Sequence, residues 1–417
     1  MSRCPRLRIR SLAGVLAALL PALLTLPAPS WAHPKETITF AGVTFSEAGR
    51  GDRLKAWVDK FNKSQAAIEV QPIAIPFSSF AKTVFTQMGG GAGPDLVRMD
   101  LMDFYAAVQN KRLLPLDDAV KAGNYKFNAP DKYMMVGGKR YGVPFEISNY
   151  VLLYNTSLVK GGKAPANFDE FLAAAKSSTG DGVYGYAYRA TMAEGAGYWQ
   201  DLCNFVYGFG GRWSDEKGNP TLNDPKVVEG VSAYKKIYDA GVTPKGTDAA
   251  TYRRMFWERK LAMEVDNGGV AGIFSQQAPE LPLAAAPSPF PTRAQGLILA
   301  PLTINANTRH KAAAEVFVKW TLQPDNQKEL QALLGASNVA TVVERSPEEL
   351  AKKPWLKVYD DQTPNSVPQL VQGQELKTPE IQQVVLEQVL KVLQGGLDPK
   401  KAMDEAQQQV VSRVLRK

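Results

Sequence analysis

Cysteine and histidine are scarce in this chain of 417 residues, which contains only Cys4, Cys203, His33 and His310. So few sulfur and imidazole groups leave little material for a zinc site or a disulfide framework. The sequence also has no G-x-S-x-G nucleophile elbow, no G-x-x-x-x-G-K-[ST] phosphate loop and no H-E-x-x-H metal motif. We therefore expect a protein that is not an enzyme and that needs no metal or cofactor.

The excess of positive charge is small as well. The formal net charge is +8, and four of the positive charges precede the first apolar run: Arg3, Arg6, Arg8 and Arg10. Such a mild and dispersed surplus argues against a nucleic-acid partner. Hydrophobic residues make up 45% of the chain and charged residues 22%, which are ordinary values for a globular protein. The length predicts two or three domain-sized units.

Residues 1–32 have the three-part pattern of a secretory signal peptide. The arginines come first, the apolar run Ser11–Leu26 follows, and Ser30-Trp31-Ala32 forms a small-x-small cleavage site. A membrane anchor is the alternative, but the run has 16 residues and is broken by Pro21, whereas a bilayer span needs about 20. No cysteine lies near the cleavage site, so we expect a protein that is free in the periplasm and is not a lipoprotein.

Strand and helix patterns alternate along the rest of the chain. Thr37–Phe40, Ile68–Ile75 and Pro94–Met99 read as strands, and the intervening segments carry helical patterns. This order predicts an α/β fold with a largely parallel sheet. The segment Tyr141–Tyr154, which contains Pro144, is typical of an extended connection. The proline-rich stretch Pro279–Pro291 cannot be a regular helix and indicates a crossing or a surface segment.

Seven short motifs then carry a resemblance to a known family. They are Ala56–Asn62, Gly93–Val97, Leu113–Asp117, Tyr141–Glu146 with Leu153–Asn155, Phe256–Met263, Ala313–Phe317 and Ala402–Ala406. In this order and spacing they are similar to motifs of the extracellular solute-binding proteins of carbohydrate-type ABC importers, the family that includes maltose-binding protein. The chain departs from the pattern where Glu258-Arg259 replaces a small residue before Lys260.

The resemblance implies the type II periplasmic binding protein fold. It has two lobes, each a mostly parallel sheet flanked by helices, and a hinge that the chain crosses more than once. Lobe one would comprise 36–145 plus 298–350, and lobe two 150–292 plus 355–417, with the ligand in the cleft between them. The implied function is to bind a mono- or oligosaccharide and deliver it to an inner-membrane ABC permease with its ATPase subunits, the binding protein itself being a monomer.

A sugar presents hydroxyl groups around apolar C–H faces, so its site needs carboxylates, amides and aromatic rings. In an α/β lobe the ligand lies at the carboxyl ends of the strands. Ser46 and Glu47 follow the first strand, although an N-cap serine with an acidic first turn is the alternative. Asp100 follows the third strand, with Asp103 one turn further on. Glu146 stands where the resemblance places an acid at the hinge.

In the second half of the chain the candidates lie near an aromatic segment and after a strand. Trp199 and Gln200 belong to the aromatic segment, with a place in the core as the alternative for the tryptophan. The others are Asp266, Asn267, Gly268 and, more weakly, Arg293. Gly269 stands where the family usually has a stacking tryptophan, which casts doubt on a long maltodextrin as ligand.

Other functions stay open at this point. A binding protein for glycerol phosphate or another polyol would need clustered basic groups in its site. A secreted carbohydrate-active enzyme would need two carboxyl groups roughly 5–10 Å apart across a sugar ring. A protein that reports a ligand to a receptor would share the binding fold, and iron binding is disfavoured because the chain has no adjacent Tyr-Tyr pair.

Overall fold

The parallel strands at the start of the chain form where apolar and β-branched residues alternate with polar ones. The computed structural model describes residues 35–47, 50–121 and 123–416, so the predicted signal peptide lies outside the described residues. β1 (Glu36–Gly42) lies between β2 (Ile68–Ala74) and β3 (Leu96–Arg98) and pairs in parallel with both. The strands predicted in this region are thus confirmed.

Helices connect these strands and cover them. In α1 (Arg50–Ser64), the residues Leu54, Trp57, Val58 and Phe61 are all buried, as their helical spacing predicts. The first α/β region continues with helices α2 (Phe77–Gly89), α3 (Leu101–Gln109) and α4 (Asp117–Lys121), the 3₁₀ turn Ala129–Met134 and the hairpin of β4 (Met135–Val136) and β5 (Lys139–Arg140).

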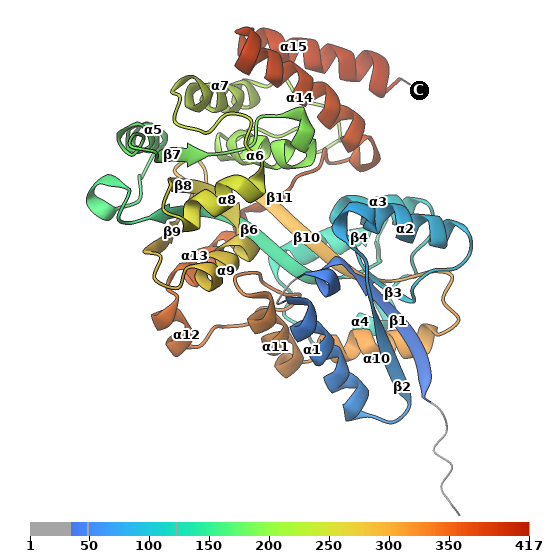
Figure 1. Cartoon of the computed structure of the whole chain (residues 1–417). Coiled ribbons are helices and arrows are strands. Elements are labelled where there is room, and N and C mark those ends of the chain that lie inside the picture. Colours follow the sequence, from blue (N-terminus) through green and yellow to red (C-terminus); the bar gives the residue numbers. More distant parts are fainter. Residues whose placement is uncertain (1–34, 48–49, 122, 417) are drawn as a thin grey trace, which may run out of the picture. The chain divides into compact units, whose positions relative to one another are not determined.

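Two long strands run side by side through the centre of the sheet (Figure 1). They are β6 (Val143–Asn155) and β10 (Gln295–Ile304). The sheet has nine strands, with the order β2-β1-β3-β10-β6-β8-β7, while β11 pairs with β10 and β9 pairs with β6. The remaining strands are β7 (Tyr184–Ala187), β8 (Leu261–Asn267), β9 (Leu283–Ala286) and β11 (Ser366–Pro368).

The sheet is less parallel than the sequence predicts. The pairs β1–β2, β1–β3, β7–β8 and β10–β11 are parallel, but β10 is antiparallel to β3 and β6, and β6 is antiparallel to β8 and β9. Alternating strands and helices imply parallel pairing only for strands joined by a helical crossover. The two long strands do not come from such units, and they join the flanking strands into one sheet.

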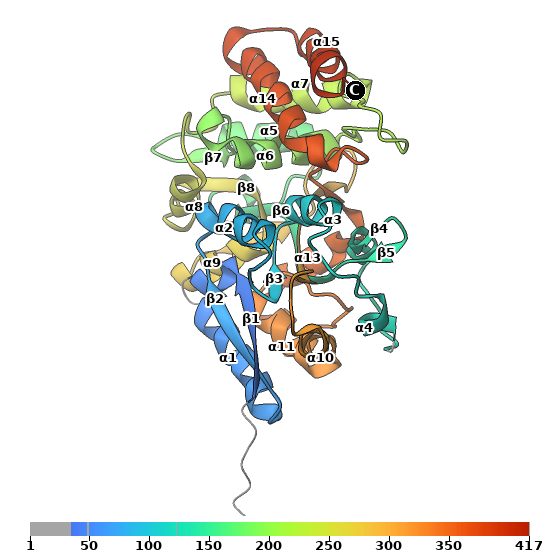
Figure 2. The ribbon, with the colours of Figure 1, turned by 90° about the vertical axis from the view of Figure 1, so that its right-hand side faces the viewer.

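The later helices do not form a single group, because those within 311–334 pack with the first half of the chain. α14 (Thr378–Gly395) contacts α15 (Pro399–Gln409), α6 (Gly195–Gly208) and α7 (Pro225–Asp239), and Figure 2 shows α14, α15 and α7 grouped together. The other helices are α5 (Phe168–Ser177), α8 (Ala249–Trp257), α9 (Gly268–Gln277), α10 (Lys311–Thr321), α11 (Pro324–Leu334), α12 (Pro347–Lys352) and α13 (Trp355–Gln362). Within the described part of the chain, every helix is too short or too polar to cross a membrane.

The long strand β6 takes part in every hydrophobic cluster of the described residues. Phe145 packs with Phe40, Trp57 and Phe317 in a cluster built mainly from the first half of the chain. Further along the same strand, Tyr150 belongs to a cluster built around α6, α7 and α14. The central strands therefore connect separately packed groups of helices, and the residues between the two clusters, Glu146 to Asn149, lie at the junction.

Candidate functional site

A cavity of about 750 Å³ lies over this junction. Its floor is formed by Glu146 and Ser148 of β6 and by Leu297–Leu299 of β10. One wall comes from the turn after β1, the end of β3 and the starts of α1 and α3. The other wall comes from the starts of α6, α8 and α9. The cavity thus gathers strand ends and helix N-termini from both halves of the chain, which is where α/β proteins bind ligands.

Glu146 holds the centre of the floor, and two arginines bind its carboxylate. Arg50 Nη2 donates to Oε1 at 2.6 Å, Arg98 Nη2 donates to Oε2 at 2.8 Å, and Ser337 Oγ also donates to Oε1 at 3.0 Å. Burial on its own would raise the pKa of Glu146, but the two arginines outweigh it and lower the pKa to about 2. Glu146 is therefore ionised at neutral pH and fixes both guanidinium groups at the cavity.

Ser148 presents an unused hydroxyl beside this ion-pair network. Residues two apart on a strand share a face, so Ser148 lies on the same side of β6 as Glu146. Its side chain is 2% exposed and its Oγ has no hydrogen-bond partner among the described residues. Nε of Arg98 is buried without a partner in the same part of the structure. Buried polar groups are normally paired, so both atoms keep an unused hydrogen-bonding capacity in residues that line the cavity.

Asp100 and Asp103 stand on the first wall at the start of α3. Asp100 is the N-cap residue, but its side chain makes no capping hydrogen bond, and Asp103 lies in the first turn. Burial raises the pKa of Asp100, although Arg98 opposes the rise from a distance of 3.8 Å between Nη1 and Oδ1. Burial and the neighbouring Asp100 raise the pKa of Asp103 to about 6. Hydroxyl donors of a ligand would compensate both carboxylates for this lost solvation.

On the opposite wall two more arginines are held by buried aspartates. Arg189 forms a bidentate pair with Asp201, at 2.8 and 2.7 Å. Gly197 makes room for it, because a Cβ at this position would lie 2.3 Å from Arg189 Nη1. Arg253 pairs in the same way with Asp266, at 2.7 and 3.0 Å. Each arginine that lines the cavity is thus already bound to a carboxylate.

Trp199 lies in the wall with its ring enclosed. It is 2% exposed, stacks on Trp213 with ring centroids 4.7 Å apart, and donates from Nε1 to the carbonyl of Gln369 at 2.9 Å. Gln369 in turn donates to the carbonyl of Gln200 at 3.1 Å. Because Trp199 is the one aromatic residue among those that line the cavity, the described lining offers no open ring face for a sugar to stack on.

The structure brings seven of the predicted site residues into the lining: Glu47, Asp100, Asp103, Glu146, Trp199, Gln200 and Asn267. Four others lie outside it. Ser46 Oγ donates to the carbonyl of Val43, and Asp266 is buried beneath Arg253. Gly268 lies so close to the backbone of Ala336 that a Cβ would clash at 2.7 Å, and the carbonyl of Arg293 accepts a hydrogen bond from Gln362.

The sequence reasoning missed the arginines and the serine of the cavity: Arg50, Arg98, Ser148, Arg189 and Arg253. One signal was available, since an acid predicted inside the hinge, such as Glu146, needs a buried cation. Nothing in the local sequence says which cation it is.

Among the described residues no group of three histidine, cysteine, aspartate or glutamate side chains is arranged to hold a metal ion.

Comparisons with known proteins show the family and the fold of the chain. The model of a family described as bacterial extracellular solute-binding protein matches residues 46–328. The chain is 26% identical over 339 residues to a Deinococcus radiodurans protein described as "Probable ABC transporter-binding protein", an alignment that covers 75% of this chain and 78% of that protein.

Solved structures share the fold. A solute-binding protein of an ABC transporter from Thermotoga lettingae, bound with alpha-D-tagatose, superposes with a TM-score of 0.77 at 20% identity, covering 92% of this chain and 100% of that one. The maltose/maltodextrin-binding domain MalE from Bdellovibrio bacteriovorus, bound to maltotriose, gives a TM-score of 0.73 at 20% identity, covering 91% and 100%.

These likenesses show that the chain has the α/β periplasmic binding protein fold. Because the family model matches more than half of the chain, the chain belongs to the bacterial extracellular solute-binding protein family. Its members bind solutes rather than transform them, which supports the expectation that this protein is not an enzyme.

Proposed function

We propose that this protein is the periplasmic sugar-binding subunit of an ABC importer and that the cavity over Glu146 holds the sugar. The observation that carries the proposal is the lining, which combines open carboxylates at Asp100 and Asp103 with the unpaired hydroxyl of Ser148. These groups suit a ligand rich in hydroxyls, which donate to carboxylates and exchange hydrogen bonds with a serine. Leu297–Leu299 supply apolar contacts for the C–H faces.

The two lobes predicted from the sequence, 36–145 plus 298–350 and 150–292 plus 355–417, belong to this proposal. Each wall of the cavity comes from one of them, with Asp100 on one side and Gln200 on the other. Both long central strands pass beneath the cavity, which suits a hinge crossed more than once. Closure of the lobes over the ligand would bury the sugar and present a closed form to the permease.

The lining favours a small neutral sugar over a long oligosaccharide and over a phosphorylated polyol. A long oligosaccharide normally uses aromatic platforms, and here Trp199 is enclosed while Gly269 occupies the position expected for a stacking tryptophan. A phosphorylated polyol needs free cations, but Arg50, Arg98, Arg189 and Arg253 are all engaged with carboxylates. We therefore propose a mono- or disaccharide, or an uncharged polyol, as the ligand.

The same proposal includes export and delivery. Residues 1–32 would be removed as a signal peptide, so that a monomer starting at His33, without a lipid anchor, delivers the sugar to an inner-membrane permease with its ATPase subunits. Mass spectrometry of the protein recovered from the periplasm should give His33 as the first residue. Retention of residues 1–32 would contradict this part of the proposal.

The function is tested by a thermal-shift and calorimetric screen of the chain from His33 onward against monosaccharides, disaccharides, polyols and glycerol phosphates. A ligand at 100 times its dissociation constant should add about 2.7 kcal/mol of stability. Asp100→Asn should weaken binding of the sugar roughly tenfold, because an amide replaces a charged acceptor. Asp181→Asn, on an exposed loop, is the matched control. Binding of glycerol phosphate without binding of any sugar would overturn the proposal of a neutral ligand if Asp100→Asn weakens it, because that places the phosphate in the cavity over Glu146.

A further inference from the structure

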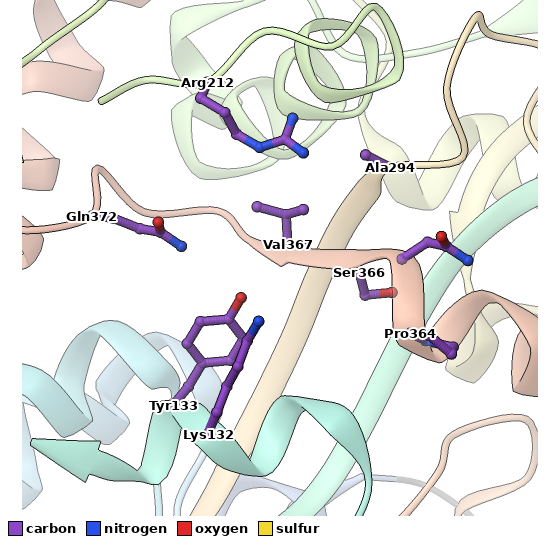
Figure 3. Close-up of a pocket in the computed structure, with 9 residues that line it drawn as sticks. Lys132, Tyr133, Arg212, Ala294, Pro364, Ser366, Val367 and Gln372 are labelled. Carbon is purple, nitrogen blue, oxygen red and sulfur yellow. The ribbon is translucent and has the colours of Figure 1, made fainter. Parts of the chain in front are cut away.

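A second cavity, of about 380 Å³, lies apart from the sugar site and has a different chemistry. Figure 3 shows Lys132 and Tyr133 reaching into it from one side, Arg212 from the opposite side and Gln372 from a third direction. Lys132 and Tyr133 belong to the 3₁₀ turn Ala129–Met134, whereas Arg212 follows α6. The cavity thus has walls from both halves of the chain, and none of its lining residues is shared with the first cavity.

The segment of β11 and its continuation separates the two cavities. Gln369 and Leu370 line the sugar site, whereas Val367 and Gln372 line the second cavity. Ala294, which directly precedes β10, lines the second cavity, whereas Leu297 of β10 lines the first. An occupant of the second cavity would therefore lie across these strands from the sugar and would not compete with it for space.

The polar side chains that line the second cavity include several hydrogen-bond donors, and two of them are positively charged. No acidic residue lines it. Within the described residues, neither Lys132 nor Arg212 forms an ion pair: the ammonium of Lys132 lies 5.1 Å from the Tyr133 ring centroid, and Arg212 donates to the carbonyl of Gly211. Burial raises the pKa of Tyr133, so its hydroxyl stays protonated and can donate at neutral pH.

This arrangement contrasts with the sugar site, where every arginine is neutralised by a carboxylate. Two cations that face one cavity without a counter-ion both attract an anion that lies between them. An arginine fork and a lysine are also the side chains that bind phosphate oxygens, the arginine by paired hydrogen bonds and the lysine as a point charge. The volume is ample for a tetrahedral oxyanion with some water.

We propose that the second cavity binds a small oxyanion, inorganic phosphate or the phosphate group of a small monoester, between Lys132 and Arg212. Tyr133 and the Gln372 amide supply further donors. The site is independent of the proposed sugar ligand, because it uses none of the residues that line the sugar cavity. Its occupant joins the turn around Lys132 to the loop after α6, two segments from different halves of the chain.

The test is isothermal titration of the chain from His33 onward with inorganic phosphate, and separately with glycerol 3-phosphate, at constant ionic strength. Saturable binding of one phosphate per chain is expected. Arg212→Gln and Lys132→Gln should each weaken it roughly tenfold. Lys217→Gln is the matched control, because it removes the same charge from an exposed position five residues after Arg212. Binding of both compounds supports a site for a phosphate group, and binding of phosphate alone supports a site that admits only the free ion.

The proposal is overturned by three results. Absence of saturable heat with both compounds excludes the site. Binding that is unchanged in the Lys132→Gln, Arg212→Gln double variant places the anion elsewhere. Phosphate that is displaced competitively by the sugar, once a sugar is found, assigns it to the first cavity. Failure of the sugar screen has no bearing on this outcome, since the phosphate titration needs no sugar.

Discussion

Glu146 and Arg50 are 96 residues apart in the sequence, yet Arg50 Nη2 donates a 2.6 Å hydrogen bond to Glu146 Oε1 on the floor of the sugar cavity. Arg98 binds the other oxygen of the same carboxylate at 2.8 Å. One buried acid thereby joins the start of α1, the end of β3 and the central strand β6. This contact gives the cavity its shape, because both guanidinium groups line it and neither is free to turn away.

Glu146→Gln should destabilise the fold and weaken sugar binding together. The substitution leaves two arginines beside a neutral amide, and removal of one partner from a buried ion pair costs about 3 kcal/mol. Urea denaturation measures the stability, and calorimetry with the ligand from the screen measures the affinity. Glu216→Gln, on an exposed loop, should change neither quantity. Unchanged stability in Glu146→Gln would show that the ion pairs contribute nothing net.

The low pKa of Glu146 also predicts how stability depends on pH. Its value is about 2 in the folded protein against an ordinary 4.5, so the folded state binds the proton more weakly than the unfolded state. The ionised carboxylate of Glu146 therefore adds to the free energy of unfolding, in full above pH 4.5, and this stabilisation is lost as the pH falls toward 2. It amounts to on the order of 3 kcal/mol. Urea midpoints measured across this range should fall more steeply for the natural protein than for Glu146→Gln, and parallel curves would contradict the assignment.

Asp103→Asn should stabilise the protein without ligand. The pKa of Asp103 is about 6 in the fold against an ordinary 3.8, so the ionised carboxyl is less favourable in the folded state. The cost is absent below pH 3.8, grows as the pH rises to about 6 and is constant above it. After allowance for solvent screening, Asp103→Asn should raise the free energy of unfolding at neutral pH by roughly 1 kcal/mol.

Thermal melts of Asp103→Asn at several pH values check this expectation, with Asp181→Asn as the exposed control. A gain that is the same at pH 3.8 and pH 6 would show that it does not come from the carboxyl charge of Asp103. A loss of stability at every pH would show that Asp103 makes a favourable contact in the empty cavity.

The sequence was sufficient for elements whose pattern is local. The spacing of Leu54, Trp57, Val58 and Phe61 predicts α1, and the helix buries all four. Acids at strand ends predict part of the cavity wall, and Asp100 does line it. The short strand β9 was not predicted, because it lies inside the proline-rich stretch and pairs with β6, more than a hundred residues away in the sequence. Its formation depends on that partner.

Contacts between distant segments explain the other differences between the prediction from the sequence and the structure. The direction of β10 relative to β6 depends on how the chain returns from the second half, so alternation of strands and helices predicted more parallel pairing than the sheet has. The arginine partners of Glu146, Asp201 and Asp266 lie between 12 and 96 residues away. Several arginines were compatible with each acid, and only the fold selects among them.

Trp199→Phe distinguishes a structural tryptophan from one that contacts the sugar. The phenyl ring keeps part of the stack on Trp213 but loses the N–H that donates to the Gln369 carbonyl at 2.9 Å. A buried carbonyl left without its donor costs about 1–3 kcal/mol, so urea denaturation should show a loss in this range. Trp257→Phe is the matched control, because the indole of Trp257 packs on Phe274. Its N–H has no hydrogen bond to a described residue, so its loss should be smaller. If Trp199→Phe instead leaves stability equal to that of the control and abolishes sugar binding, the ring must open to the ligand, and the sugar site has the aromatic platform that its closed lining lacks.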